Sequence, residues 1–391
     1  GRRDRAHRRG PGGLPGPPQM TFEQVATARL VAIDAANRRR ALVPIEPAGA
    51  MTVRVAGREV VLFSSNDYLG LSTHLEVRAA VAEAAERHGL GPRGSALVCG
   101  HTTHHEALAQ ELASFVNKPA CLLFPTGFGA NGGALGAVAG QGAAIFSDAL
   151  NHASIIDGCR LTRAQVQVYR HADVSHLETL LKATPASVRV VVTDAVFGMD
   201  GDLAPLRDIA ALKQRHEFIW IVDEAHASLV FGPGLAGHLG VEDAVDLHVG
   251  TLSKAFGAQG GFVATSERGR DLLVNTARTN IFSTALPLPV VAGVRAALRV
   301  GPARRAALWQ RVAQLGHHLG RTLASPIAPI LLGDETRTMA AARALLEAGH
   351  HVVGIRPPTV PEGTSRLRIA LSSEHTPAQI DALAAALTSL N

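Results

Sequence analysis

The feature that most constrains the fold is the alternation of short apolar runs with helix-period segments from Ser64 onward. Nearly continuous apolar runs at 188–192 and 218–222 alternate with segments of helical period at 104–117 and 205–216. Strands that are apolar on both faces are typical of parallel sheets covered by helices on both sides. We therefore predict an α/β fold with a mostly parallel central sheet covered by helices.

The rhythm changes beyond about Pro287. Long helical segments there flank two strand-like runs, HVVGI at 351–355 and RLRIALS at 366–372, which predicts a smaller α+β C-terminal domain. Near the start, a helix-like segment precedes two strand-like runs that are separated by Ala56-Gly57, the pattern of a hairpin. The expected organisation is a disordered basic tail at 1–19, an N-terminal helix and hairpin at 20–62, a large ligand-binding domain at 63–287 and the C-terminal domain at 288–391.

Composition and charge exclude some classes of protein. The chain has 391 residues, of which 47% are hydrophobic and 18% are charged, and no apolar run reaches membrane-spanning length without interruption. Five arginines and one aspartate at 1–19 account for +4 of the net charge of +5. The basicity thus belongs to the tail, and we expect neither a nucleic-acid partner nor a membrane.

The cysteines indicate a reducing compartment. There are three of them, an odd number without C-x-x-C spacing, which argues against a disulfide framework or a structural zinc site. We therefore expect a cytoplasmic protein without a bound metal. The arginine-rich tail could be an upstream extension or the remnant of a targeting segment.

Polar residues and glycines follow several predicted strands, where ligands bind in open α/β sheets. The glycine-rich turn after ACLLFP can offer backbone N–H groups and the positive end of a helix to a phosphate. A lysine follows DLHVG, although the chain has only four lysines, and small residues after it leave room for a ligand. The candidates at these strand ends are Gly127, Phe128, His152, Asp223, His226, Thr251 and Lys254.

One cofactor, pyridoxal 5′-phosphate (PLP), uses this whole set. It needs a lysine amine for a Schiff base, a carboxylate that keeps its pyridine nitrogen protonated, and donors to its phosphate. The segment VDEAH at 222–226 also matches a Mg²⁺-binding motif of nucleic-acid helicases. Those proteins need a phosphate loop in which lysine follows glycine, and no lysine here follows a glycine.

Ordered motifs resemble those of the α-oxoamine synthases, a family of PLP-dependent enzymes. The resemblance extends from about Met20 to the C-terminus. It implies a fold-type I PLP-dependent transferase that condenses an amino acid with an acyl thioester and releases CO₂. In chain order the motifs are SSNDYLGL (64–71), GPRGSALVCG (91–100), PTGFGAN (125–131), DALNHASIIDG (148–158), DAVFGMDGD (194–202), VDEAH (222–226), GTLSKAFG (250–257), FSTALP (282–287) and IRPPTVPEGTSRLRIALS (355–372).

The resemblance implies roles for the residues around the cofactor. Lys254 would form the Schiff base and later move the proton at the substrate's Cα. Asp223 would pair with the pyridine nitrogen, His226 would bind the phenolic oxygen, and His152 would stack on the ring. The phosphate would be held by Gly127, Phe128, Thr251 and, from the partner subunit of a homodimer with active sites at the interface, Thr284.

The resemblance also implies substrate-binding residues. The motifs are most similar to the family member that condenses L-alanine with a pimeloyl thioester, on CoA or a carrier protein, in biotin biosynthesis, in its plant-like form. The alternative is another member of the family, acting on glycine or serine with a different acyl thioester. The residues expected to bind substrate are Arg368 at the amino-acid carboxylate, Asn66 near the reacting carbonyl, Arg356, Thr359, and Arg38 at the distal carboxylate of a pimeloyl chain.

Two positions depart from the family pattern. Gly198 stands where the family usually has serine, and Ala227 where it usually has glycine.

Several candidate residues could have a purely structural role instead. Asp223 alone could cap a helix, His226 could be a core histidine, and Arg356 and Arg368 could form ion pairs on a strand. The chain could also be a catalytically silent subunit, although such subunits lack the Schiff-base lysine.

Overall fold

The computed structural model describes residues 19–36 and 38–390, so that residues 1–18 of the predicted tail lie outside the described residues. Contacts divide the chain into two units, 1–44 and 45–391. The first contains helix α1 (Phe22–Ala35). It begins with a capping box, in which Gln24 N donates to Thr21 Oγ1 at 3.3 Å and Thr21 N donates to Gln24 Oε1 at 2.9 Å.

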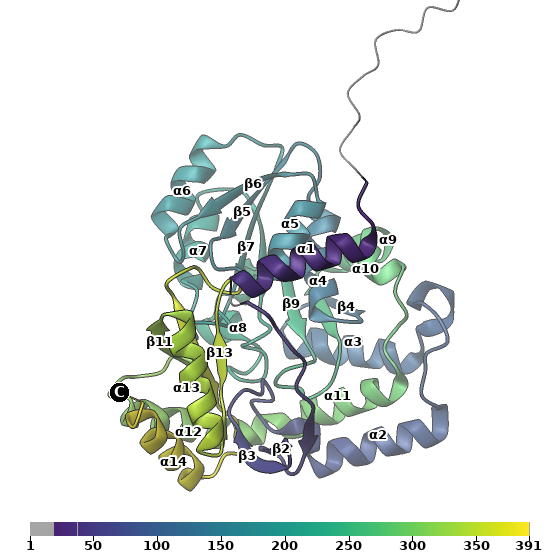
Figure 1. Cartoon of the computed structure of the whole chain (residues 1–391). Helices are drawn as coiled ribbons and strands as arrows, with labels where there is room; N and C mark the ends of the chain where they lie inside the picture. Colours follow the sequence, from purple (N-terminus) through teal and green to yellow (C-terminus); the bar gives the residue numbers. More distant parts are fainter. Residues whose placement is uncertain (1–18, 37, 391) are drawn as a thin grey trace, which may run out of the picture. The chain divides into compact units, whose positions relative to one another are not determined.

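The larger unit is built on a seven-stranded sheet with the order β4-β10-β9-β8-β7-β5-β6 (Figure 1). Strands β9, β8, β7, β5 and β6 are paired in parallel, and β10 runs antiparallel to both β4 and β9. The mostly parallel central sheet predicted from the apolar runs is therefore confirmed. The strands are β4 (Ala120–Phe124), β5 (Ala143–Asp148), β6 (Gln165–Tyr169), β7 (Val188–Asp194), β8 (Ile219–Asp223), β9 (Leu247–Thr251) and β10 (Gly261–Thr265).

Helices cover both faces of this sheet. In β7, Val190 and Val192 belong to a core cluster that includes side chains of α4, α5 and α9, whereas Val191 packs with side chains of α6 and α7. Successive side chains of a strand point to opposite faces, so this division explains why the strand is apolar throughout. The helices of this part are α2 (Leu75–His88), α3 (Thr103–Phe115), α4 (Gly127–Val138), α5 (Ala153–Leu161), α6 (Val174–Ala183), α7 (Leu206–Lys213), α8 (Leu235–Leu239), α9 (Glu267–Thr276), α10 (Arg278–Ile281) and α11 (Leu288–Val300).

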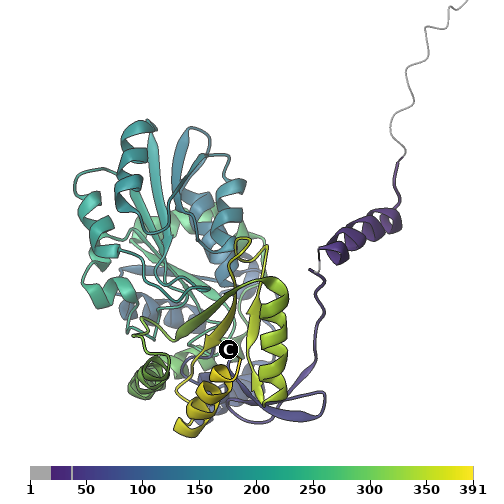
Figure 2. The same cartoon turned by 60° about the vertical axis from the view of Figure 1, so that its left-hand side comes forward.

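A smaller antiparallel sheet, with the order β11-β14-β13, lies in the C-terminal part together with three helices (Figure 2). This agrees with the predicted α+β character of that part. Its elements are α12 (Arg305–His318), β11 (Ile327–Gly333), α13 (Glu335–Glu347), β13 (Val353–Ile355), β14 (Ser365–Ala370) and α14 (Pro377–Thr388).

The predicted hairpin turns at Ala56 and Gly57, whose φ angles are 48° and 79°. Positive φ at both central residues is typical of the tight turns that match the twist of a hairpin. The hairpin joins a four-stranded sheet of β1 (Ile45–Pro47), β2 (Thr52–Val55), β3 (Arg58–Leu62) and β12 (His350–His351), in which β3 and β12 run parallel. The domain boundaries proposed at 62/63 and 287/288 stay predictions.

None of the helices that the structure describes is both long enough and apolar enough to cross a membrane.

The core should tolerate a cavity poorly and the surface should tolerate the same truncation well. Leu108 of α3 has no exposed surface, whereas Leu161 at the end of α5 is 80% exposed. We expect Leu108→Ala to lower the free energy of unfolding by about 3–5 kcal/mol because it removes packed methyl groups and leaves a cavity. Leu161→Ala should change it by less than about 0.5 kcal/mol. Urea denaturation followed by circular dichroism measures both, and equal losses would contradict the assigned core.

Candidate active site

The candidate site lies at the carboxyl ends of neighbouring parallel strands. Asp148 ends β5, Asp194 ends β7 and Asp223 ends β8, and Asp194 and Asp223 are paired across the sheet. All three carboxylates are buried. Thr251, also buried, ends β9 next to them. This edge of the sheet is where ligands bind in open α/β folds, and here it carries a concentrated negative charge.

Lys254 lies beside this charge, in the bend that follows β9. Its Nζ is 2.8 Å from Nε2 of His226. Burial lowers the pKa of Lys254 to about 8, and the nearby carboxylates of Asp223 and Asp194 offset only part of that effect. About a tenth of the amine is therefore unprotonated at neutral pH, far more than for an ordinary lysine, as a nucleophilic lysine requires.

Asp223 is held by two donors. Asn131 Nδ2 on α4 donates to its Oδ2 at 2.6 Å, and the backbone N–H of Ala225 donates to its Oδ1 at 2.8 Å. Both contacts need an acceptor, which is the ionised carboxylate. A carboxylate has further lone pairs, so Asp223 can accept one more proton-bearing group.

A chain of contacts joins Lys254 to a buried arginine. The hydroxyl of Tyr68 is 2.6 Å from His226 Nδ1 and donates to Asn66 Oδ1 at 3.2 Å. Arg368 Nη2 of β14 donates to the same Asn66 oxygen at 2.9 Å. Burial lowers the pKa of His226 well below its ordinary value, with smaller contributions from Lys254 and Arg368, so that its ring is neutral.

Tyr68 was missed by the sequence reasoning. It lies inside the motif at 64–71, and the chain has only two tyrosines, which is the one signal that could have singled it out. Its side chain has no exposed surface. Its position between His226 and Asn66 is decided by the packing of segments that are far apart in the chain.

His152 is positioned as the N-cap of α5. Its backbone N–H donates to Asp194 Oδ2 at 2.7 Å, and its Nδ1 is 2.7 Å from Ser154 Oγ. Burial lowers the pKa of His152, although the charge of Asp223 opposes this, so that the imidazole is neutral and suited to stack on an aromatic ring. Asp194 is a second residue that the sequence reasoning missed, and its place at the end of a predicted strand could have indicated it.

The N-terminus of α4 meets the end of β9 without an intervening side chain. A Cβ atom on Gly127 would lie 2.9 Å from Oγ1 of Thr251, so only glycine fits there. Thr126 caps the helix by accepting from Gly129 N at 2.9 Å, and this leaves the N–H groups of Gly127 and Phe128 directed beyond the helix end. The backbone N–H groups of Gly127 and Phe128 and the hydroxyl of Thr251 thus form a site that can bind an anion.

These groups fit PLP. An amine of lowered pKa can bind its aldehyde, an ionised carboxylate can hold a protonated pyridine nitrogen, and a helix N-terminus with a hydroxyl can hold its phosphate. In addition, Oδ1 of Asn131 is buried without a hydrogen-bond partner among the described residues, which leaves an acceptor close to Asp223 that a ligand can use.

The remaining predicted residues lie in three places. Thr284 forms an isolated antiparallel bridge with Ser95. Arg356 and Thr359 lie in the loop after β13, where Thr359 N donates to Arg356 O at 3.1 Å. Arg38 belongs to the N-terminal unit. The roles predicted for these residues stay predictions.

The two departures from the family pattern both lie close to His226. A Cβ atom on Gly198 would be 2.5 Å from His226 Nε2, so a serine there would require the imidazole to shift. Ala227 follows His226 directly and is fully buried. The missing hydroxyl at 198 is thus replaced by a close approach of the backbone to the imidazole.

Comparisons with known proteins show the family to which the chain belongs. The sequence model of the family "Aminotransferase class I and II" matches residues 58–387. The chain is 51% identical to 8-amino-7-oxononanoate synthase of Anaeromyxobacter sp. (strain K), over 93% of this chain and 94% of that protein. It is 44% identical to the enzyme of the same name from Arabidopsis thaliana, over 85% of this chain and 75% of that protein.

Solved structures of fold-type I relatives superpose on the chain. Serine palmitoyltransferase of Sphingomonas wittichii has a TM-score of 0.88 at 31% identity, with 94% of this chain and 96% of that chain covered. The 8-amino-7-oxononanoate synthase of Francisella tularensis has a TM-score of 0.73 at 27% identity, with 85% and 96% covered. A variant of serine palmitoyltransferase of S. paucimobilis, at 31% identity, has been solved with a bound PLP–myriocin aldimine.

The lowered pKa of Lys254 predicts how PLP capture depends on pH. The unprotonated fraction of an amine with a pKa of about 8 rises about tenfold between about pH 7 and pH 9. We expect the rate of covalent PLP capture by the cofactor-free protein to rise in proportion, as followed by the visible absorption band. Lys254→Ala should show no such band. A rate that rises about a hundredfold over the same interval and continues to rise to about pH 10, as for an amine of ordinary pKa, would contradict the lowered pKa.

Proposed function

The chain belongs to the class I and II aminotransferase family, and on that premise we propose that it is a PLP-dependent 8-amino-7-oxononanoate synthase. It condenses L-alanine with pimeloyl-CoA or a pimeloyl-carrier protein and releases 8-amino-7-oxononanoate, CO₂ and the free thiol, as a step of biotin biosynthesis. The observation that carries the reaction class is the chain of contacts from Lys254 to Arg368. The substrates are supported by curated relatives of that name at 44–51% identity.

Different residues of the chain have separate roles in the reaction of the amino-acid substrate. When bound, PLP supplies an electron sink for the electrons left at the alanine Cα. Lys254 would hold the cofactor through Nζ, and its free amine would take the Cα proton and later return one. Asp223 would keep the pyridine nitrogen protonated, and neutral His226 and His152 would bind the phenolic oxygen and the ring face.

Arg368 is the residue proposed to bind the amino-acid carboxylate. Its Nε donates to the backbone oxygen of Gly198 at 2.5 Å and its Nη2 donates to the side-chain oxygen of Asn66, so these two contacts orient the guanidinium while it keeps further N–H groups for a ligand. Asn66 lies between Arg368 and Tyr68, which is consistent with a place near the reacting carbonyl. Arg356, Thr359 and Arg38 are proposed to bind the rest of the acyl donor.

We propose that Gly127, Phe128 and Thr251 bind the cofactor phosphate together with Thr284 of the partner subunit. This requires a homodimer with active sites at the interface. The part that lies within one chain is supported by the α4 N-terminus, which closely approaches Thr251. A cytoplasmic location is proposed from the cysteine usage.

An assay with matched substrate pairs tests the function. The purified protein, loaded with PLP, would be given L-alanine with pimeloyl-CoA, glycine with acetyl-CoA or succinyl-CoA, and L-serine with palmitoyl-CoA. We expect mass spectrometry to find 8-amino-7-oxononanoate from the first pair alone, and none from the Lys254→Ala variant.

Other outcomes would replace the proposal. Turnover of a glycine or serine pair instead would assign a different synthase of the family, which is relevant because serine palmitoyltransferases superpose with the larger TM-scores. Covalent PLP capture without turnover of any pair would indicate a catalytically silent subunit.

The role of Asp223 predicts a selective loss of rate. Asp223→Asn removes the partner of a buried cation, a change that costs about 3–5 kcal/mol. We expect kcat to fall at least about a hundredfold, while some PLP is still bound through Lys254. Asp381→Asn, on α14 in an exposed pair with His318, is a control of the same chemistry and should retain full rate. Full retention of rate by Asp223→Asn would overturn its assignment.

A further inference from the structure

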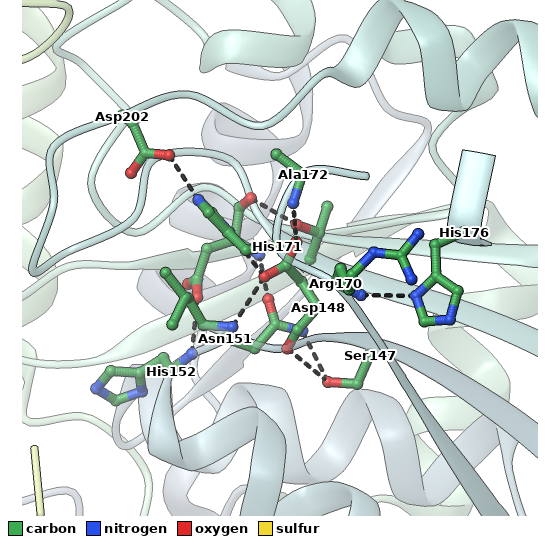
Figure 3. Close-up of polar contacts among 12 residues, drawn as sticks. Ser147, Asp148, Asn151, His152, Arg170, His171, Ala172, His176 and Asp202 are labelled. Carbon is green, nitrogen blue, oxygen red and sulfur yellow. Dashed lines mark hydrogen bonds and ion pairs between the residues drawn. The ribbon is translucent and has the colours of Figure 1, made fainter. Parts of the chain in front are cut away.

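A histidine that has no part in the proposed chemistry lies between two carboxylates close to the site. His171, in the turn between β6 and α6, has its Nδ1 2.9 Å from Asp148 Oδ1 and its Nε2 2.7 Å from Asp202 Oδ2 (Figure 3). Its ring packs edge-on against Phe197, with 4.4 Å between ring centroids and an angle of 89° between the planes. Both the polar and the apolar parts of the side chain are therefore held.

The two contacts determine its charge. Carboxylate oxygens only accept, so both ring nitrogens of His171 must donate, and only the imidazolium can do so. The same hydrogen bonds, to Asp148 first and then to Asp202, raise the pKa of His171 to about 10 and outweigh the opposing effect of burial. His171 is thus a cation throughout the neutral range.

On one side, this cation holds the loop that presents His152. The Asp148 carboxylate is 1% exposed and also accepts from the backbone N–H of Leu150 at 2.8 Å and of Ala172 at 2.8 Å. Asn151 continues the loop and donates through Nδ2 to Val192 O at 2.9 Å. The next residue is His152. Its orientation therefore depends on a loop whose first carboxylate is neutralised by His171.

On the other side, the cation holds the turn that contacts the arginines of β14. Asp202 closes this turn, because its carbonyl accepts from Phe197 N at 3.0 Å. Within the turn, Gly198 O accepts from Arg368 at 2.5 Å, and Asp200 forms an ion pair with Arg366. The turn at 197–202 thus links His171 to the guanidinium that is proposed to bind the amino-acid carboxylate.

We propose that His171, donating to Asp148 and Asp202 at once, is a positioning residue that fixes the His152 loop and the Arg368-contacting turn relative to each other. It touches neither cofactor nor substrate and acts through Asp148 and Asp202. Loss of the second donor would let the two segments move independently, which weakens both ring stacking and carboxylate binding. The proposal rests on the proposed function for the identity of the amino acid, L-alanine.

The test measures the binding of PLP and of L-alanine by absorption, without the acyl thioester, and measures kcat in a separate assay with both substrates. His171→Gln keeps a similar length but is uncharged, and its two N–H donors share one nitrogen, so it cannot reproduce the donors at the two separate ring nitrogens. We expect the dissociation constants of PLP and of L-alanine each to rise about tenfold, while kcat at saturating substrates stays within about threefold. His171→Arg, which retains a cation with several donors, should recover part of the loss.

His318→Gln is the matched control. His318 Nε2 lies 2.7 Å from Asp381 Oδ1 on α14, in a histidine–carboxylate pair between helices of the C-terminal part. The control should change neither dissociation constant. If His171→Gln does not fold, Asp202→Asn replaces it, because that side chain is 43% exposed and the change removes one carboxylate charge from the pair.

Each result decides the question. Weaker binding of PLP and L-alanine in His171→Gln or Asp202→Asn, with the control unchanged, supports the proposal. Lower thermal stability with both dissociation constants within about twofold of the unaltered protein would overturn it, since that is the signature of a structural role alone. Failure of the proposed function would be separate, because it would show as absent condensation by the unaltered protein.

Discussion

Burial of the Lys254 amine against a group of carboxylates is the interaction on which the site depends. Desolvation lowers its pKa to about 8, and the charges of Asp223 and Asp194 keep that decrease from going further. A lysine in water would be almost wholly protonated at neutral pH, and one without carboxylate neighbours would be costly to bring close to the sheet. The pKa of Lys254 is thus set by the balance between burial, which lowers it, and the carboxylates at the ends of the parallel strands, which raise it.

That balance explains why the neighbouring groups are arranged as they are. Three buried carboxylates end β5, β7 and β8, and without cations they would repel one another. Burial and the proximity of Asp223 raise the pKa of Asp194 well above its ordinary value. Lys254 and His171 supply positive charge close to the group, and backbone N–H groups donate to each of the three carboxylates. The structure therefore separates one reactive cation, Lys254, from one held permanently between carboxylates, His171.

The fold contributes by joining two parts of the chain at the same place. β14 belongs to the smaller sheet, yet its Arg368 contacts Asn66 and Gly198, which precede and follow strands of the larger part. Because Tyr68 and His226 connect Asn66 to Lys254, the proposed carboxylate site and the cofactor amine are parts of one hydrogen-bonded network. A substitution at the proposed carboxylate site can therefore change the binding of the cofactor, and binding measurements on variants can detect this effect.

Much of the fold and part of the site follow from local sequence. Apolar runs on both faces of strands determined the parallel sheet, and glycine or polar residues directly after those runs indicated Gly127, His152, Asp223 and Lys254. These signals are local, since strand ends can be read from a few neighbouring residues. Asp194 also ends a predicted strand, whereas Tyr68 and His171 carry no such signal. Their roles come from contacts such as Tyr68 with His226, which are 158 residues apart in the chain, and such contacts are decided only when the packed core brings separate strand ends together.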